Sequence, residues 1–217
     1  MINLGVVAGG THEAKALIDG WALPEDVAAA RARPDSLLAR AVLRALLQHF
    51  SGCHGWHLRS NPRGKPFVVD DNGKAGPFVS LSHSRGMVSC AVSWTGPLGV
   101  DVERHRPRDV AALAAYAFGP REIAEVARDG ASAFFRIWTL REAIAKASGD
   151  GLPLAIDGQD RGDGAPLQGW LRRDGWWLLT ALPHPGTSLA VALTAEPGAS
   201  APSLDWINIA RVRHPRL

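Results

Sequence analysis

The sequence has few of the residues that a disulfide-stabilised or membrane-embedded protein needs. Its 217 residues include two cysteines, Cys53 and Cys90. Two are too few for a disulfide framework, and this usage favours a reducing compartment, so we expect a cytoplasmic protein. No stretch of about 18 uninterrupted apolar residues occurs, which excludes a membrane-spanning helix. The first 30 residues also lack a basic start followed by an apolar run, so we expect no secretory signal.

Lysine is also scarce. Of the 24 Lys plus Arg residues only four are lysines, and 21 Asp plus Glu leave a formal net charge of +3. Arginine forms paired hydrogen bonds with phosphate and carboxylate groups. The weak basic excess therefore permits phosphorylated ligands, acidic proteins or nucleic acid as partners without selecting one of them, and a simple composition bias is the alternative explanation.

Helix-like and strand-like patterns occur in clusters along the chain. Apolar spacing predicts helices over 35–50, 109–128 and 131–148, the first with Asp35 or Ser36 as its N-cap. The strands that we expect cover 67–69, 78–81, 87–93, 98–102, 170–182 and 188–193, and the first two should form a hairpin. Residues 1–20 show little beyond a strand that runs into a glycine turn. Because strands cluster instead of alternating with helices, the pattern indicates an α+β fold of two similar halves that meet near residue 100.

The first candidate site lies in the expected strand Gly99-Val100-Asp101-Val102-Glu103. Alternate residues of a strand point to the same side, so Asp101 and Glu103 bring two carboxylates together. Close like charges repel unless a cation lies between them, and a hard oxygen-binding ion such as Mg²⁺ fits that place. The alternative is a strand edge that ends in solvent-exposed polar residues.

The second candidate site lies on the 131–148 helix. Trp138, Glu142 and Lys146 recur every four residues and share one face. In the functional interpretation Glu142 is a third carboxylate for the metal, and Lys146 neutralises charge on a departing phosphate. The alternative is a packed tryptophan beside a surface Glu–Lys pair, which stabilises a helix by only about 0.3–0.5 kcal/mol.

The third candidate site combines Ser82-His83-Ser84 with Gly64-Lys65-Pro66. Small hydroxyls beside a histidine offer donors to phosphate oxygens, and Lys65 adds a point charge. Ser82 and His83 cannot easily form a nucleophile–base pair, because adjacent strand residues face opposite ways. No Gly-x-Ser-x-Gly elbow accompanies them, so the sequence argues against a serine hydrolase.

A further group, Cys53-His54 with His57, contains three potential metal ligands but no fourth at a recognisable spacing. We interpret these residues as structural. The tryptophans, including Trp176-Trp177, are expected in the core. Few basic residues are interleaved with them, so we expect no nucleic-acid binding.

Together these stretches resemble the 4′-phosphopantetheinyl transferase superfamily, and within it the two-lobed type that activates carrier proteins of surfactin-like synthetases. The family pattern is Gly-x-Asp-x-Glu, followed further along the chain by Trp-x-x-Lys-Glu-Ala-x-x-Lys. Residues 99–103 match the first part, and residues 138–146 match the second with Arg141 in place of the usual lysine. The Gly-Lys-Pro and Ser-His-Ser stretches and residues 36–44 of the first predicted helix also match in order, although Asp35 stands where family members often have arginine.

The resemblance implies a role for each matched residue. Asp101, Glu103 and Glu142 would hold Mg²⁺, or Mn²⁺, against the pyrophosphate of coenzyme A. Glu142 would also act as the base, and Lys146 would stabilise the leaving phosphate. The residues expected to contact the phosphates and the nucleotide of coenzyme A are Ser36, Arg40, Arg44, Lys65, Ser82 and His83.

The resemblance also implies an enzyme that transfers phosphopantetheine from coenzyme A to a serine of an acyl or peptidyl carrier protein, releasing 3′,5′-ADP. We expect a monomer with an acidic carrier protein as its partner and no binding to membranes. The fold would be two α+β lobes with a pseudo-two-fold relation, each a small, mostly antiparallel sheet packed on a long helix. The lobes would span residues 1–98 and 99–217, with the active site in the cleft between them.

Two other functions remain open. A non-catalytic member of the family would bind coenzyme A or a carrier protein without turnover, although a dead enzyme would not need all of Asp101, Glu103, Glu142 and Lys146. A Mg²⁺-dependent nucleotide phosphatase would need the metal site but no surface that docks a carrier protein.

Overall fold

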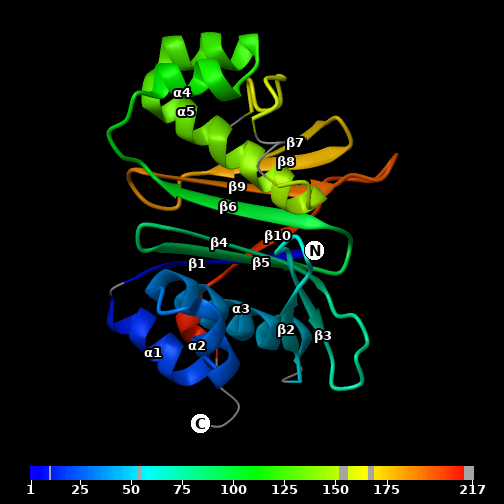
Figure 1. Cartoon of the computed structure of the whole chain (residues 1–217). Coiled ribbons are helices and arrows are strands. Elements are labelled where there is room, and N and C mark those ends of the chain that lie inside the picture. Colours follow the sequence, from blue (N-terminus) through cyan, green and yellow to red (C-terminus); the bar gives the residue numbers. More distant parts are fainter. Residues whose placement is uncertain (10, 53–54, 152–155, 166–168, 213–217) are drawn as a thin grey trace. The chain divides into compact units, whose positions relative to one another are not determined.

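The chain forms two compact units in a computed structural model that describes residues 1–9, 11–52, 55–151, 156–165 and 169–212. One unit comprises Met1–Gly96 and the segment from Pro202 onward, and the other comprises Pro97–Ala201 (Figure 1). We expected the whole chain after residue 98 to form the second lobe. The segment from Pro202 onward instead joins the first unit, where strand β10 (Leu204–Ile207) pairs in parallel with β1 (Ile2–Ala8).

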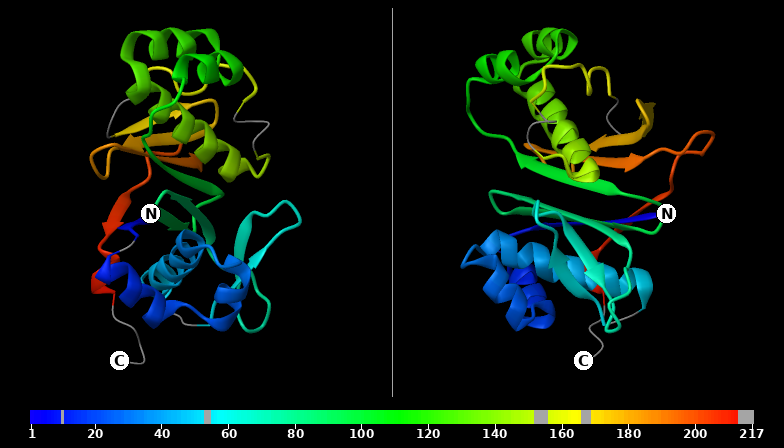
Figure 2. Two further views of the ribbon diagram at one scale, coloured as in Figure 1. Left: turned by 60° about the vertical axis from the view of Figure 1, so that its left-hand side comes forward. Right: turned by 45° about the vertical axis from the view of Figure 1, so that its right-hand side comes forward.

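The first unit contains a four-stranded sheet and a separate two-stranded ribbon. Its other elements are α1 (His12–Trp21), α2 (Pro24–Ala30), α3 (Pro34–Ser51), β2 (His57–Ser60), β3 (Pro66–Val69), β4 (Phe78–Ser84), β5 (Met87–Ser93) and the short 3₁₀ helix η1 (Ile209–Arg211). The sheet has the order β10-β1-β5-β4, and β2 and β3 form the ribbon. Helices α1 and α3 lie on the same face of the sheet (Figure 2).

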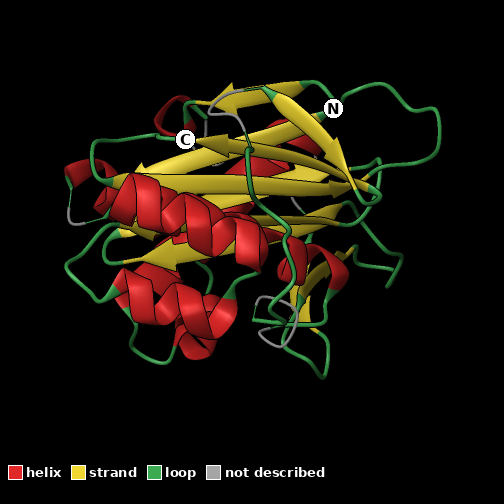
Figure 3. Cartoon of the chain, turned by 90° about the horizontal axis from the view of Figure 1, so that it is seen from above, coloured by secondary structure: helices red, strands yellow, loops and turns green. Residues whose placement is uncertain are grey.

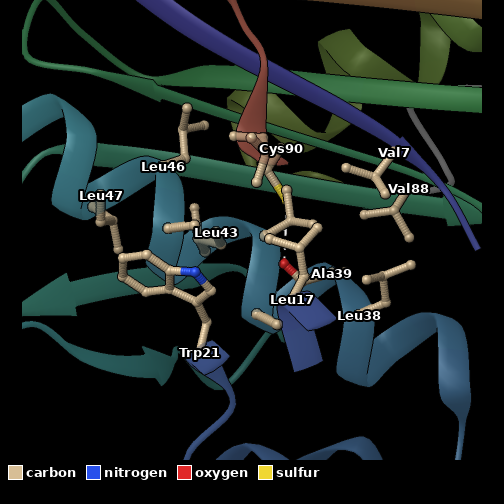
Figure 4. Close-up of a cluster of buried hydrophobic side chains, with 14 of the residues drawn as sticks. Val7, Leu17, Trp21, Leu38, Ala39, Leu43, Leu46, Leu47, Val88 and Cys90 are labelled. Carbon is tan, nitrogen blue, oxygen red and sulfur yellow. Dashed lines mark hydrogen bonds between the residues drawn. The ribbon is translucent and has the colours of Figure 1, made fainter. Parts of the chain in front are cut away.

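The core of this unit lies between α3 and the sheet. Leu43 and Leu46 of α3 are fully buried with Val88 and Cys90 of β5 (Figure 4). Each such side chain contributes about 1.5–3 kcal/mol relative to leaving it in water. The thiol of Cys90 donates to the carbonyl oxygen of Ala39 at 3.2 Å, and this cysteine is a buried core residue.

Predictions for this unit are partly confirmed. The 35–50 helix and the 87–93 strand appear as α3 and β5. The predicted hairpin of 67–69 with 78–81 is wrong, because β3 pairs with β2 and β4 pairs with β5. The predicted N-cap is also wrong, because Pro34 begins α3 and Arg33 is its N-cap. Asp35 accepts a hydrogen bond from the backbone N–H of Gly86 at 2.8 Å.

The second unit is a four-stranded antiparallel sheet covered by a long helix. Its elements are β6 (Leu98–Arg104), α4 (Val110–Ala117), α5 (Pro120–Ser148), β7 (Trp170–Arg173), β8 (Trp176–Ala181) and β9 (Thr187–Thr194), in the strand order β6-β9-β8-β7. Helix α5 packs on β6, β9 and β8, and the view from above shows helices lying over the strands (Figure 3). The predicted strand over 170–182 is two strands, separated by a turn at Asp174 and Gly175. Both units therefore confirm an α+β fold with largely antiparallel sheets.

No helix in the described part of the chain is both long and apolar enough to cross a bilayer.

Helix α5 consists of two segments that fold back on each other at Gly130. The backbone of Gly130 is not helical, with φ 66° and ψ −145°. In a straight helix, Glu122 and Arg141 would lie about 28 Å apart at about 1.5 Å per residue. Instead Nη1 of Arg141 lies 2.7 Å from Oε2 of Glu122. The segment before Gly130 therefore lies alongside the segment after it, which is the helix predicted over 131–148.

Helix α5 and strand β6 make a close backbone contact at Gly99. A Cβ atom on Gly99 would lie 2.6 Å from the backbone nitrogen of Ala147 and closer still to the carbonyl oxygen of Ala143. Any larger residue would push α5 away from β6. The first glycine of the sequence motif is therefore required by packing.

Replacing Gly99 with alanine should lower the free energy of unfolding by about 3 kcal/mol, because the backbone of α5 has to move. Gly20→Ala in α1 is the matched control, since a Cβ there meets nothing within 4 Å. Alanine favours a helix over glycine by up to about 1 kcal/mol. Urea denaturation followed by circular dichroism measures both values, and a Gly99→Ala variant as stable as the parent would contradict the close contact.

Candidate functional site

Within the second unit, the lysine of the second candidate site pairs with an acidic residue of the first candidate site. Nζ of Lys146 donates to Oδ1 of Asp101 at 2.6 Å and to the carbonyl oxygen of Val100 at 3.3 Å. Asp101 is only 4% exposed, whereas the side chain of Lys146 is 31% exposed, so the ion pair is shielded from solvent on the side of the acid. Lys146 therefore joins α5 to β6 at the point where the two motifs meet.

Glu142 lies half-buried beside the same ion pair. Burial raises the pKa of its carboxyl group, and the negative charge of Asp101 raises it further. The positive charge of Lys146 opposes this rise in pKa, and Glu103 adds a smaller upward contribution. Asp101, Glu103 and Lys146 thus all act electrostatically on the carboxyl group of Glu142.

The donor set of this acidic group suits a hard divalent cation. Repulsion between neighbouring carboxylates is relieved when a cation binds between them. Mg²⁺ commonly takes one or two protein carboxylates and completes its octahedron with water and phosphate oxygens. Asp101, Glu103 and Glu142 include enough carboxylates for such an ion. Within the described residues, no three or more His, Cys, Asp or Glu side chains are arranged as a metal-binding group.

Two other residues of the second motif have structural surroundings. Trp138 stacks on Phe134 with ring centroids 6.2 Å apart, as expected for a packed tryptophan. Arg141 is fully buried, and its guanidinium pairs with Glu122 and with Asp157. Sequence reasoning missed both acidic partners. The available signal was the arginine itself, since a guanidinium at a lysine position indicates more than one acceptor.

The third candidate site lies in the first unit, on neighbouring elements. Ser82 is buried and His83 half-buried near the end of β4, in keeping with their opposite faces. Lys65 directly precedes β3, which packs against β4. Its backbone N–H donates to Oδ1 of Asn61 at 2.9 Å, and the N–H of Asn61 donates to the Lys65 carbonyl at 3.0 Å. These bonds fix the turn that presents Lys65.

Arg40 and Arg44 both pair with one buried acid in α2. Nη1 of Arg40 lies 3.4 Å from Oδ1 of Asp26, and Nε of Arg44 donates to Oδ2 of the same residue. Arg44 also lies 3.1 Å from Oε1 of Glu25. Asp26 is fully buried and accepts the N–H of Leu23 at the start of α2. The two arginines thus hold α2 against α3, a role that their spacing of four residues did not reveal.

A cavity of about 420 Å³ lies beside the start of α3 in the first unit, with Lys15 and Asp35 in its wall. Ser36 follows Asp35 and is itself buried.

Of the cysteine and histidine group noted in the sequence, Cys53-His54 lies outside the described residues. The third member is described: Nε2 of His57 is 2.8 Å from Oδ1 of Asp71.

Comparison with known proteins connects the second unit to one family. Residues 97–194 match the sequence model of the 4′-phosphopantetheinyl transferase superfamily. The chain is 37% identical over 121 residues to the 4′-phosphopantetheinyl transferase HetI of Nostoc sp. (strain PCC 7120 / SAG 25.82 / UTEX 2576), covering 52% of this chain and 51% of that protein. It is 34% identical over 103 residues to the 4′-phosphopantetheinyl transferase gsp of Aneurinibacillus migulanus, covering 46% and 40%. It is 28% identical over 109 residues to the 4′-phosphopantetheinyl transferase of Bacillus subtilis, covering 45% and 47%.

These matches span about half the length of the curated relatives or less. The range matched by the family model nevertheless contains β6, α4 and α5, and with them the whole acidic group and Lys146. The resemblance predicted from the motifs is therefore confirmed: residues 97–194 of this chain match the sequence model of the 4′-phosphopantetheinyl transferase superfamily.

Proposed function

We propose that the protein transfers the 4′-phosphopantetheine group of coenzyme A to a serine of an acyl or peptidyl carrier protein, releasing 3′,5′-ADP. The observation that supports this best is the grouping of Asp101, Glu103 and Glu142 with Lys146 in the unit that matches the family. The relatives are named 4′-phosphopantetheinyl transferases, which suggests the reaction, and the acidic group with Lys146 is the site that we assign to it.

Transfer breaks the bond between the phosphorus that bears pantetheine and the bridging oxygen of the pyrophosphate, and forms a bond from that phosphorus to the serine oxygen. Such chemistry depends on positioning and on neutralising charge. In our proposal Glu142 accepts the proton of the serine hydroxyl, directly or through a water. Lys146 stabilises the phosphate of the departing 3′,5′-ADP. Mg²⁺ or Mn²⁺, held by Asp101 and Glu103 with Glu142, would neutralise charge on the pyrophosphate when bound.

The first unit would supply the contacts to the rest of coenzyme A. We propose Lys65 and His83 for the phosphates, with Ser82 in support. Ser36, Arg40 and Arg44 complete the proposed nucleotide contacts, and the two arginines would act while they remain paired with Asp26.

We further propose that the two units are the paired lobes of the family, related by a pseudo-two-fold axis, with coenzyme A in a cleft between them. Each unit by itself has the required composition, a four-stranded sheet with a long helix on it. We propose that the protein is a cytoplasmic monomer. The partner would be a carrier protein with acidic residues around its serine, which suits the net charge of +3.

Incubation with coenzyme A, Mg²⁺ and an apo carrier protein should increase the mass of the carrier by one phosphopantetheine group and release an equal amount of 3′,5′-ADP. Mass spectrometry of the intact carrier measures the product, and chelation of the metal should stop the reaction. A panel of acyl and peptidyl carriers without any mass shift would favour a binding protein. Phosphate release from nucleotides without a carrier would favour a phosphatase.

Glu142→Gln should lower kcat for this transfer by about 10²–10⁴-fold, because the amide cannot accept the serine proton. Glu125→Gln is the matched control, since Glu125 lies on the same helix but pairs with Arg136. The control should transfer at nearly the parent rate in the same mass-spectrometric assay. A Glu142→Gln variant with normal kcat would remove Glu142 from the mechanism.

Asp101→Asn should weaken Mg²⁺-dependent binding of coenzyme A by about ten-fold or more, because a metal ligand loses its charge. Calorimetry with and without Mg²⁺ measures the metal-dependent part of the affinity. Asp174→Asn is the control, since Asp174 is exposed in a turn of the same unit and asparagine tolerates its positive φ of 50°. Equal metal-dependent affinities for Asp101→Asn and the parent would contradict the metal assignment.

A further inference from the structure

We propose that Arg141 is a positioning residue, which through Glu122 and Asp157 fixes the rotation of α5 and so places Glu142 beside Asp101. The inference deepens the proposed function, because it rests on the role given there to Glu142. It starts from the one position at which the second motif departs from the family pattern.

The guanidinium of Arg141 joins separate parts of the second unit. Its Nη1 donates to Oε2 of Glu122 at 2.7 Å and to the carbonyl oxygen of Gln159 at 2.6 Å. Its Nη2 donates to Oδ1 of Asp157 at 2.8 Å and to the carbonyl oxygen of Ala117 at 3.0 Å. The second half of α5 is thereby tied to the end of α4, to the first turn of α5 and to the segment that follows α5.

Glu122 extends the network through backbone groups. Its Oε1 accepts the N–H groups of Arg161 at 3.0 Å and Gly162 at 2.6 Å. Its Oε2 accepts the N–H of Gly119 at 3.2 Å in addition to Arg141. Arg141 and Glu122 are both fully buried. A buried ion pair whose remaining acceptors are satisfied by fixed backbone groups is tied to one geometry.

These contacts control the rotation of α5 about its own axis. On the side of β6 the helix is held by the close contact at Gly99, and on the side of α4 it is held by Arg141. Glu142 follows Arg141 in the helix, so the contact at Gly99 and the contacts of Arg141 together set the direction of the Glu142 side chain. A carboxylate about 6 Å from the helix axis moves by about 3 Å when the helix rotates by about 30°. A rotation of that size would separate Glu142 from Asp101.

A lysine could not replace this network in full. The fork of Arg141 presents two nitrogens in one plane and uses both of them, one toward Glu122 and one toward Asp157. A lysine ammonium is a single point of charge and cannot reach both carboxylates with the same geometry. The carbon of the guanidinium also lies 5.3 Å from the centre of the Phe118 ring, a contact that suits a planar cation.

Arg136 supplies a matched control on the same helix. It is also buried, and its Nη1 donates to the carbonyl oxygens of Gly162 at 3.1 Å and Ala165 at 3.0 Å. It also pairs with Glu125. Its removal should reduce stability through the same segment, but it lies more than one helical turn before Glu142.

The experiment compares Arg141→Met, Arg141→Lys and Arg136→Met at a temperature where circular dichroism shows each of them folded. Mn²⁺ binding, followed by electron paramagnetic resonance without coenzyme A or carrier, measures the acidic group without turnover. Arg141→Met should weaken Mn²⁺ affinity by about ten-fold or more, and Arg141→Lys should recover part of it. The same order should appear in the Mg²⁺ concentration required for half-maximal transfer. Arg136→Met should bind Mn²⁺ within about two-fold of the parent protein.

Unchanged Mn²⁺ affinity in Arg141→Met would overturn the inference, and so would an equal loss in Arg136→Met. If Arg141→Met does not fold, Arg141→Lys and Asp157→Asn take its place, and normal affinity in both would overturn the inference. Absence of Mn²⁺ binding by the parent protein would overturn it as well. If the parent binds Mn²⁺ but does not modify any carrier, and the Arg141 variants still bind more weakly, the proposed reaction fails while the positioning role stands.

Discussion

The candidate site depends on the close packing of a helix against the edge strand of a sheet. At Gly99 the backbone of β6 touches the backbone of α5 with no side chain between them. This contact brings the carboxylates of the strand within range of the carboxylate and the lysine of the helix. Lys146 then joins the two elements through Asp101. The same short motif therefore has a packing role and a proposed chemical role. Gly99 allows the close contact with α5, and Asp101 and Glu103 are the acids that this contact positions.

The two cationic residue types have different tasks in this protein. Arginines form the buried networks, around Asp26 in the first unit and around Glu122 in the second, where a planar fork satisfies several acceptors at once. The half-buried cation of the acidic group is Lys146, a compact charge on a flexible stem. One of the few lysines thus lies where a flexible point charge suits the acidic group. The arginines of the buried networks lie where a rigid, planar charge is required.

The sequence predicted the features that depend on local pattern. The main helices, the β5 and β6 strands and the α+β class follow from periodicity and spacing. Side-chain direction placed Asp101 and Glu103 on one side of a strand and Glu142 and Lys146 on one face of a helix, whereas the meeting of strand and helix was expected only from the family resemblance. Sequence reasoning failed where pairing depends on distant segments. The predicted hairpin wrongly paired β3 with β4. Their actual partners, β2 and β5, have equally strand-like sequences, so the local pattern could not select the right pairs. Helix α1 was missed, although Thr11 caps it and the apolar residues Ala14, Leu17 and Trp21 repeat at helical spacing. The partners of Arg40, Arg44 and Arg141 were beyond reach, because only the fold brings Asp26, Glu122 and Asp157 to them.

The parallel pairing of β10 with β1 has a consequence for how the molecule is assembled. The strand that completes the first unit is encoded after the whole of the second unit, which is a continuous stretch of chain. During synthesis the second unit can therefore fold from an uninterrupted sequence, while β1 remains an unprotected sheet edge until β10 leaves the ribosome. Unprotected edges pair readily with other chains. The pairing of β10 with β1 can therefore form only after the second unit has been synthesised, and until then the free edge of β1 is open to pairing with other chains.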